Sequence, residues 1–426
     1  MLERIYLIFS LLYFAGGLTP SDLAETQRSH AIDRANSLLQ LVVFPLLILL
    51  FARNWKKLSG TLHSFALPLL FSALSLCSIL WSPAPGFTTR RSVIMLGLTV
   101  FSLYIGARFS LPELIGLFGW MTVVFVLSSY ILALVKPEWA LSTGYHWGAW
   151  KGVFGHKNTL GRMALFGAIV LFTAHPLGVP RVLRHIAAWG SLGLIILSGS
   201  ATSLLAAGFL TSLWPLLPIL KLKRRNTVPL WLAFLPIAAF IGVAIIGNFG
   251  SLLQSVGRDS TLTGRTTLWN AIINVASQRQ ILGFGYSAFW HYDGPERAAL
   301  FSQVGWHPPH AHNSYLDMWL DLGYPGLALL AYMLVSLFLK AAKLYRVSSS
   351  PSAGFPLMFL LYLVTVNFTE SDLFRTHSFQ WAPCVGIYTS LRLLENRAKR
   401  SSDVSRREPV LPGVNAMMAG LRVYSN

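Results

Sequence analysis

The chain has 426 residues, of which 54% are hydrophobic and only 12% are charged. This composition lies outside the range of soluble globular proteins and excludes an ordinary soluble domain. The net charge of +18 could indicate a nucleic-acid partner, but the distribution of the charges along the chain, described below, argues against one.

Apolar runs recur along the whole chain, and about twelve approach the roughly 20 residues that a helix needs to cross a bilayer. A backbone in lipid must satisfy its own hydrogen bonds, and segments of this length do so as helices. The sequence therefore predicts an all-α polytopic membrane protein with about 12 transmembrane helices. The runs cover residues 5–20, 37–52, 64–81, 92–108, 112–135, 160–176, 186–199, 201–220, 229–247, 316–340, 355–368 and 379–393.

The start of the chain, Met1 to Phe9, resembles a signal sequence, but no A-x-A-like cleavage site follows it. We therefore expect an uncleaved first helix. If the N-terminus is cytoplasmic and every run crosses, most Lys and Arg residues fall inside, whereas basic and acidic residues nearly balance outside. This is the positive-inside bias, so the basicity reflects topology and no nucleic-acid partner is predicted.

Two outer loops are longer than the usual connection of roughly 4–6 residues. Both are rich in aromatic residues, which argues against disorder, so we expect the longer one to form short helices that cap the bundle. The predicted organisation is about nine N-terminal transmembrane helices over 1–247 with an outer loop at 136–158, a large outer loop at 248–315, about three C-terminal transmembrane helices over 316–395, and a disordered cytoplasmic tail over 396–426.

Motifs for nucleotide or metal chemistry are missing from the sequence. There is no Walker loop, no GxGxxG after a strand, no HExxH and no cluster of acidic ligands. Cys77 and Cys384 lie in apolar runs without metal-ligand spacing. We therefore expect no cofactor and no metal.

The segment from Pro308 to Asp317 places two histidines and an amide, His310, His312 and Asn313, just before an apolar run. Histidine is the side chain best able to take and return a proton near neutral pH, so this segment is interpreted as a reaction centre at the membrane surface. Alternatively, His312 caps the helix that begins near Ser314 or lies hydrated at the interface.

Several short motifs occur in an order that resembles the O-antigen ligase superfamily, which includes exopolysaccharide polymerases. The resemblance spans roughly residues 70–395. Its motifs are Trp81-Ser82-Pro83 followed by Arg90-Arg91, Gly155-His156-Lys157-Asn158, Ser198 to Ser203, Gly264-Arg265 with Trp269, Gly283-Phe284-Gly285, His310-Ala311-His312-Asn313-Ser314-Tyr315-Leu316 and Asn367-Phe368-Thr369-Glu370-Ser371.

The resemblance implies a membrane glycosyltransferase of the bacterial inner membrane, with its active site on the periplasmic side, where the outer loops would lie. Its donor would be a glycan on undecaprenyl diphosphate. Its acceptor would be the next lipid-linked glycan in a polymerase or a lipid A core sugar in a ligase. The implied reaction, among membrane lipids, needs neither a nucleotide sugar nor a metal.

The match assigns the catalytic base to His312 and a diphosphate clamp to Arg265, while Asn313 would orient the histidine or a sugar hydroxyl. This chemistry fits the residue types, because a histidine can deprotonate an acceptor hydroxyl. Arginine binds phosphate oxygens with a planar fork and can stabilise developing charge. The alternative for Arg265 is a loop salt bridge or snorkelling to lipid headgroups.

Further substrate-binding candidates are Lys157, Asn158, Arg258 and His310. Lys157 could instead anchor at the interface, Arg258 could pair with its neighbour Asp259, and His310 could shape the loop. The Ser198–Ser203 turn carries no arginine, so a second diphosphate cation stays unassigned. Two late carboxylates are expected near Arg375, either as an ion pair or at the acceptor; they are Glu370 and Asp372.

An alternative function is a secondary transporter of a polysaccharide precursor or another solute. The missing internal repeat and the near absence of charge within the apolar runs argue against it. The resemblance favours the exopolysaccharide branch but leaves ligase and polymerase open. With one base and no evident nucleophilic carboxylate, we expect single displacement with inversion.

Overall fold

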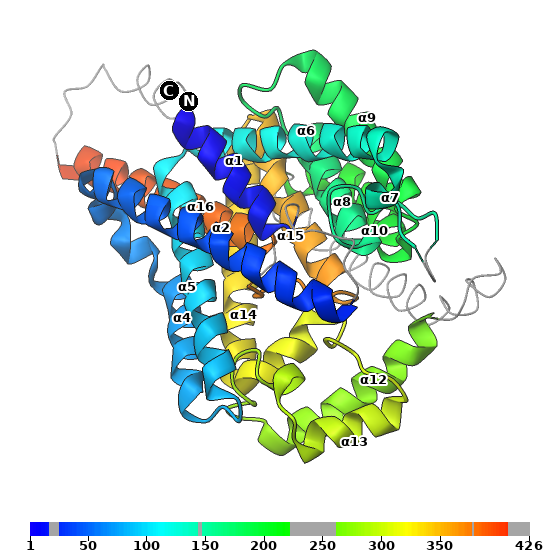
Figure 1. Ribbon diagram of the computed structural model, residues 1–426. Helices are drawn as coiled ribbons and strands as arrows, with labels where there is room; N and C mark the ends of the chain where they lie inside the picture. Colours follow the sequence, from blue (N-terminus) through cyan, green and yellow to red (C-terminus); the bar gives the residue numbers. More distant parts are fainter. Residues whose placement is uncertain (17–24, 144–146, 222–260, 377–378, 408–426) are drawn as a thin grey trace.

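The computed structural model describes residues 1–16, 25–143, 147–221, 261–376 and 379–407, and within these ranges it consists of helices and their connections (Figure 1). In chain order the α-helices and 3₁₀ helices (η) are α1 (Leu2–Phe14), α2 (Glu25–Arg53), α3 (Trp55–Leu58), η1 (Ser59–Ser64), α4 (Ala66–Cys77), η2 (Ser78–Leu80), α5 (Pro85–Arg108), α6 (Leu111–Val135), α7 (Pro137–Ala140), α8 (Lys157–Thr173), α9 (Arg181–Leu197), α10 (Ala201–Leu213), η4 (Trp214–Lys221), α12 (Thr261–Ala276), η5 (Ser277–Arg279), η6 (Phe289–His291), α13 (Pro295–Val304), α14 (Ser314–Val347), η7 (Pro351–Gly354), α15 (Phe355–Asn367) and α16 (Trp381–Arg407).

Four helices of the described chain are long and apolar enough to cross a membrane: α5, α6, α10 continued by η4, and α14. Shorter apolar helices lie at Leu39–Arg53, Ala66–Leu80 and Pro351–Asn367. The predicted class, an all-helical membrane protein, is confirmed, whereas the count of about 12 spans stays a prediction. The predicted run at 229–247 and the beginning of the large loop, 248–260, lie outside the described residues.

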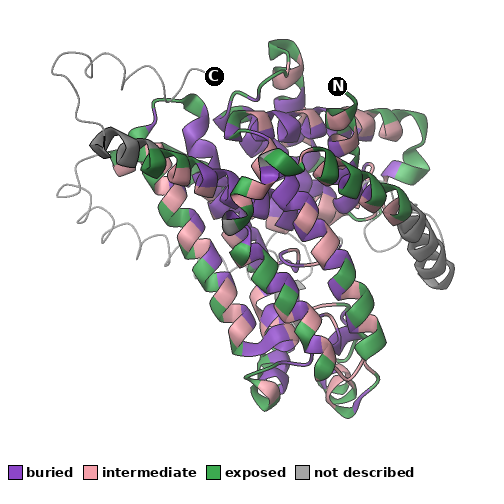
Figure 2. Ribbon diagram, turned by 90° about the vertical axis from the view of Figure 1, so that its left-hand side faces the viewer, coloured by how far each residue is buried: buried purple, intermediate pink, exposed green. Residues whose placement is uncertain are grey.

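The bundle has one large apolar core, and Figure 2 shows the buried residues inside with exposed residues on the outward faces. Many of these exposed residues are large and hydrophobic. On α14, for example, Tyr332 and Leu339 are each 61% exposed, as expected for side chains that contact lipid tails. Inside, α5 and α16 approach closely, because a Cβ added at Gly106 would lie 2.4 Å from the carbonyl oxygen of Gly386. Small residues of this kind let membrane helices pack backbone to backbone.

The segment from α12 to residue 313, called here the outer module, has a small core of its own at the lower end of the bundle in Figure 1. Aromatic and aliphatic side chains of α12, η6 and α13 meet there, with Leu320 of α14 contributing from the bundle side. The members are Leu268, Ala271, Ile272, Val275, Ala276, Phe284, Phe289, Trp290, Leu300, Ala311 and Leu320.

The helix α14 is broken at Gly323, whose φ of 62° and ψ of −157° are not helical. A Cβ at this position would lie 2.2 Å from the carbonyl oxygen of Ile281, so only glycine fits. The outer module satisfies backbone groups around the break: Phe284 N–H donates to the Leu320 carbonyl at 2.6 Å, and Tyr324 N–H donates to the Gln280 carbonyl at 2.9 Å. A break in a buried helix is tolerated when its polar groups find such partners.

The helix α16 continues to Arg407, so residues 396–407 are helical where the sequence suggested a disordered tail. A basic stretch can extend a helix into water once an apolar segment has nucleated it, because each further residue adds a hydrogen bond at little cost.

Candidate functional site

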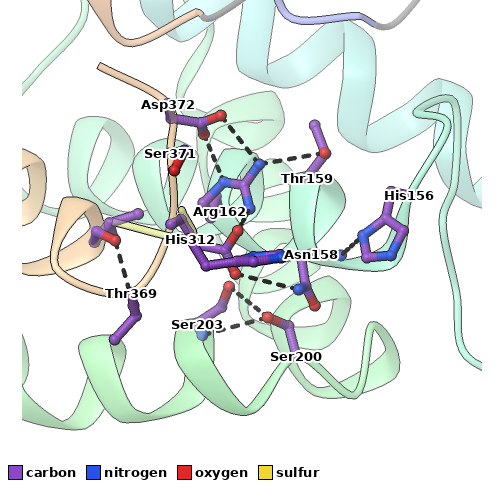
Figure 3. Close-up of polar contacts among 12 residues, drawn as sticks. His156, Asn158, Thr159, Arg162, Ser200, Ser203, His312, Thr369, Ser371 and Asp372 are labelled. Atoms are coloured by element: carbon purple, nitrogen blue, oxygen red, sulfur yellow. Dashed lines mark hydrogen bonds and ion pairs between the residues drawn. The ribbon is translucent and has the colours of Figure 1, made fainter. Parts of the chain in front are cut away.

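Segments far apart in the sequence meet around the connection between α15 and α16, of which residues 368–376 are called here the site loop. Asn158, at the start of α8, donates from Nδ2 to Glu370 Oε1 at 3.2 Å. The backbone N–H of Asn313, just before α14, donates to Ser371 Oγ at 3.0 Å. Two of the motif segments are therefore held against a third, the site loop (Figure 3).

The start of α10 joins the same place from the other side of α8. A Cβ at Gly161 would lie within 3 Å of the Ser203 hydroxyl and of Ser200 Cβ, so the two helices touch there. Lys157 lies 3.5 Å from the carbonyl oxygen of Gly199 through its ammonium group. The close contact requires glycine on α8 and small hydroxyl residues on α10, which accounts for that motif.

Each of the three helices begins with a side-chain cap. His156, Ser200 and Asn313 accept hydrogen bonds from backbone N–H groups in the first turns of α8, α10 and α14, respectively. A cap satisfies donors that the helix leaves unpaired and fixes where the helix starts. Three positive helix-dipole ends are thereby gathered in one region, which favours the binding of an anion.

A buried cation in this region is Arg162 of α8, whose side chain is only 8% exposed. Its Nη1 lies 2.8 Å from Glu370 Oε2, and its Nε lies 2.6 Å from Asp372 Oδ2. The two carboxylates were expected near Arg375, but the structure pairs them with Arg162. A buried cation needs such partners to offset its loss of hydration, so the pairs hold the site loop against α8.

Arg265 of α12 approaches the site loop with donors to spare. Its Nη1 donates to the Thr369 carbonyl at 2.8 Å, and its Nη2 lies 3.6 Å from Glu370 Oε1. A guanidinium has five N–H donors, and these two contacts leave others available. Arg162 is paired with two carboxylates, whereas Arg265 keeps N–H donors that can bind a ligand oxygen.

His312 adopts the left-handed backbone conformation, with φ of 50°. This conformation is uncommon for a residue with a side chain and indicates that the surroundings impose it. The N–H of His312 donates to Nδ1 of His310 at 3.2 Å, and the two ring centroids are 4.0 Å apart. Nδ1 of His312 is buried, and within the part of the chain that is described it has no hydrogen-bond partner.

The surroundings keep His312 neutral. Burial lowers the pKa of His312 from 6.5 to about 3, and the charge of Arg265 acts in the same direction, while Asp317 opposes it. Burial also lowers the pKa of His310 well below its ordinary value, with the charge of Arg375 as the next cause. An unpaired, neutral imidazole beside cations is ready to accept a proton when an anion arrives.

Arg375 of the site loop acts electrostatically on both histidines and lowers the pKa of each. Among the described residues it forms no ion pair or hydrogen bond. Sequence reasoning missed Arg375 and Arg162 as site residues. Arg162 had a usable signal, because an ionisable residue inside an apolar run is expensive and marks a functional site by default.

The predicted residues thus fall into three groups. The structure places His312, Arg265, His310, Asn158 and Asn313 around the site loop. The carbonyl oxygen of the Asn313 side chain accepts from the N–H groups of residues 315 and 316, so this residue caps α14. Lys157 lies at the rim, next to α10. Arg258 lies outside the described residues.

Two of the motifs meet away from this site. Trp81 donates from Nε1 to the Leu282 carbonyl at 2.9 Å, and a Cβ at Gly285 would lie 2.7 Å from Ser82 Cβ. The Trp81–Pro83 and Gly283–Gly285 motifs therefore attach the outer module to the connection between α4 and α5. Their role in the structure is packing.

The described residues contain no group of three or more His, Cys, Asp and Glu side chains arranged to hold a metal ion. A cavity of about 210 Å³ adjoins the Arg162–Asp372 pair, lined also by His156, which caps α8, by Thr159 of α8 and by Gln380. Around the site loop as a whole, the cations and helix amino ends suit an anionic ligand, and the neutral His312 can accept a proton.

The chain matches a family model described as O-antigen ligase over residues 186–331. The match runs from α9 into α14 and includes Arg265 and His312. The chain is also similar to the exopolysaccharide production protein ExoQ of Rhizobium meliloti (strain 1021), with 28% identity over 306 residues that cover 67% of each protein. Both similarities agree with the resemblance that the motifs indicated.

Proposed function

We propose that this chain, which matches an O-antigen ligase family model over residues 186–331 and is similar to an exopolysaccharide production protein, transfers glycans from undecaprenyl diphosphate at the periplasmic face of the bacterial inner membrane. The relative's name connects that protein with exopolysaccharide production, which favours polymerisation, with a second lipid-linked glycan as acceptor. We extend this assignment to the present chain as a proposal.

The observation that carries the proposal is the neutral His312, whose Nδ1 has no hydrogen-bond partner among the described residues, near Arg265 and Arg375 and the amino ends of three capped helices. Guanidinium groups and helix amino ends bind phosphate oxygens. A dry, preorganised set of positive groups is also suited to stabilise the charge that develops on a leaving diphosphate. Arg375 supplies the second cation that the sequence left unassigned.

The proposed reaction is a single displacement. An acceptor hydroxyl attacks the anomeric carbon of the donor while His312 takes the hydroxyl proton. The bond between the anomeric carbon and the diphosphate oxygen breaks, and its electron pair leaves with undecaprenyl diphosphate, next to Arg265. The attack comes from the side opposite the leaving group, so the configuration at the anomeric carbon inverts.

The low pKa of His312 in the empty site fits this scheme through the charge of the donor. The diphosphate adds negative charge next to His312 and offsets the arginines that lower its pKa. Binding of the donor would therefore raise the pKa of His312 towards the range in which a base works well. The site becomes basic when the substrate is present.

The test uses the purified full chain in detergent with a lipid-diphosphate-linked oligosaccharide and without nucleotide or divalent metal. We expect a ladder of lengthened glycans and released undecaprenyl diphosphate. His312→Ala should lower the rate roughly 10²- to 10⁴-fold, the usual contribution of a general base. His175→Ala, an exposed histidine in the connection between α8 and α9, serves as the matched control.

The outcomes separate the alternatives. Transfer to added lipid A core without a ladder would assign the same chemistry to a ligase. Full activity in His312→Ala would remove the proposed base. Absence of turnover with both acceptors would contradict a transferase and favour the transporter.

A further inference from the structure

A groove of about 640 Å³ lies along α13 of the outer module, outside the cluster around the site loop. Its volume is in the range of small-molecule sites, roughly 300–1,000 Å³. The lining comes from the turn before α13, from one face of α13 and from the turn after it. The groove residues are Asp293, Gly294, Pro295, Arg297, Ala298, Phe301, Ser302, Gly305, Trp306 and His307.

The lining combines aromatic faces with charged and hydroxyl groups. Trp306 is 40% exposed, and the His307 ring lies edge-on to Phe301 with a centroid distance of 4.6 Å. Arg297 donates to the Trp290 carbonyl at 2.8 Å, pairs with Asp293 and lies over the Phe301 ring. A surface built to contact lipid tails would not carry this ion pair, whereas a sugar presents both apolar C–H faces and hydroxyl groups.

The groove ends beside the proposed base. Trp306 lines it and also faces His312, with a distance of 6.3 Å between the ring centroids. The turn that places Trp306 depends on Gly305, which ends α13 in the left-handed conformation with φ of 76°. A ligand lying along α13 and over Trp306 would therefore bring its end to His312.

We propose that this groove binds the acceptor glycan, with Trp306 as the aromatic face on which a sugar ring stacks. The inference rests on the proposed function, because His312 must meet the hydroxyl of the acceptor. The positively charged region around Arg265 and Arg375 suits the donor diphosphate, whereas the groove, with its paired Asp293 and Arg297, suits an uncharged or weakly charged carbohydrate chain.

The experiment uses the full chain in nanodiscs and, as probe, the oligosaccharide released by mild acid from the lipid-linked pool of the host. Binding of this probe is measured by calorimetry, and the KM of the same probe as acceptor is measured with lipid-linked donor present. Trp306→Ala should weaken binding and raise the acceptor KM by roughly three- to tenfold, with the donor KM unchanged. Trp306→Tyr, which keeps an aromatic face, should recover most of the loss.

The matched control is Trp147→Ala, at a tryptophan that is 85% exposed and does not line the groove. Equal binding and equal acceptor KM in Trp306→Ala and in the wild type would overturn the groove assignment while leaving the transferase intact. Absence of probe binding to the wild type would overturn it as well. If the wild type binds the probe through Trp306 but transfers nothing, the groove binds a glycan that is not an acceptor, and the proposed function is wrong.

Discussion

At the scale of single residues, the site depends on a difference between two arginines of the same charge. Arg162 is enclosed by Glu370 and Asp372 and fixes the site loop. Within the described residues, Arg265 contacts one backbone carbonyl and one more distant carboxylate, so it keeps donors for a ligand. The number of partners, and not the charge, separates a structural cation from one that can bind substrate.

Arg265→Lys is expected to lower the transfer rate by about tenfold or more, because an ammonium group cannot reproduce the planar fork of donors. The rate with lipid-linked donor is the measurement. Arg279→Lys in the same outer module, where the guanidinium lies 3.7 Å from Glu296 and is 39% exposed, should leave the rate nearly unchanged. Equal rates in both variants would reduce Arg265 to a structural contact.

The pH profile should differ between the free and the donor-bound protein. With a pKa of about 3, His312 is neutral in the empty site over the physiological range, so kcat/KM should show no acid limb from His312 near pH 6.5. Bound diphosphate raises this pKa, so kcat should fall at a higher pH than kcat/KM does. The diphosphate is esterified at both ends and keeps its charge in this range. Coincident acid limbs in the two profiles would contradict the assignment.

The same shift has a consequence for stability. Because the pKa of His312 is lower in the folded protein, the unfolded chain takes up the proton first as the pH falls. The stability that His312 contributes is complete above pH 6.5 and is lost as the pH falls from there towards 3. This acid sensitivity should be smaller in His312→Ala.

Sequence motifs led to His312 and Arg265, because their residue types suit the chemistry and their order matched a family. Arg162 was missed although its place in an apolar run was a usable signal, and its partners could not be identified because they are more than 200 positions away in the chain. Arg375 was seen only as a partner for carboxylates. Tertiary contacts decide which of several cations keeps free N–H donors. Local sequence patterns do not reveal these contacts.

At the scale of helices, the site is formed by the first turns of three helices, so it depends on where each helix begins. α8, α10 and α14 begin at capped residues, and these caps coincide with motifs recognised in the sequence. Shifting a helix start by one residue would rotate its first side chains by about 100°. The caps therefore keep His312 and Asn158 in register with the site loop.

Asn313→Ala should cost about 1 kcal/mol of stability by removing the cap of α14, and it should lower activity because His312 is the preceding residue. Asn313→Ser keeps a capping oxygen and should restore both. Thermal unfolding and the transfer rate are measured in the same detergent. A stable but inactive Asn313→Ser would instead show that the amide contacts the substrate.

Within the described residues, helices lie where the sequence has long apolar runs, since such runs leave a backbone in lipid few alternatives. The break in α14 was not predicted, although Gly323 followed by Pro325 is a recognised interruption signal. The sequence could not indicate which residues would hydrogen-bond to the backbone groups around the break. The segment at 280–285 supplies those hydrogen bonds from about 40 residues away.

At the scale of the whole molecule, the outer module with α12 and α13 lies at the lower end of the bundle (Figure 1), whereas the basic residues of α14 lie towards its C-terminal end, at Lys340, Lys343 and Arg346. The positive-inside rule predicts that this basic end lies in the cytoplasm. The outer module would then face the periplasm, where the proposed donor is used.

This orientation can be measured with single cysteines in a background without Cys77 and Cys384. Ser302→Cys on α13 should react with a membrane-impermeant maleimide in intact cells whose outer membrane has been permeabilised. Arg346→Cys, near the end of α14, should react only after the inner membrane is opened. Reversed labelling would contradict the periplasmic site while leaving the fold unaffected.

The break at Gly323 also divides α14 into a membrane-spanning segment and a segment that belongs to the site. Residues 324–347 form a stretch of about 36 Å at 1.5 Å per residue, long enough to span a hydrocarbon core with some tilt. Residues 314–322 are held instead by the outer module and the site loop. A thinner or thicker bilayer is then met by tilting of the longer segment, while the segment that follows His312 keeps its place. Transfer should accordingly depend little on acyl-chain length, so the reaction centre is insulated from the thickness of the membrane around it.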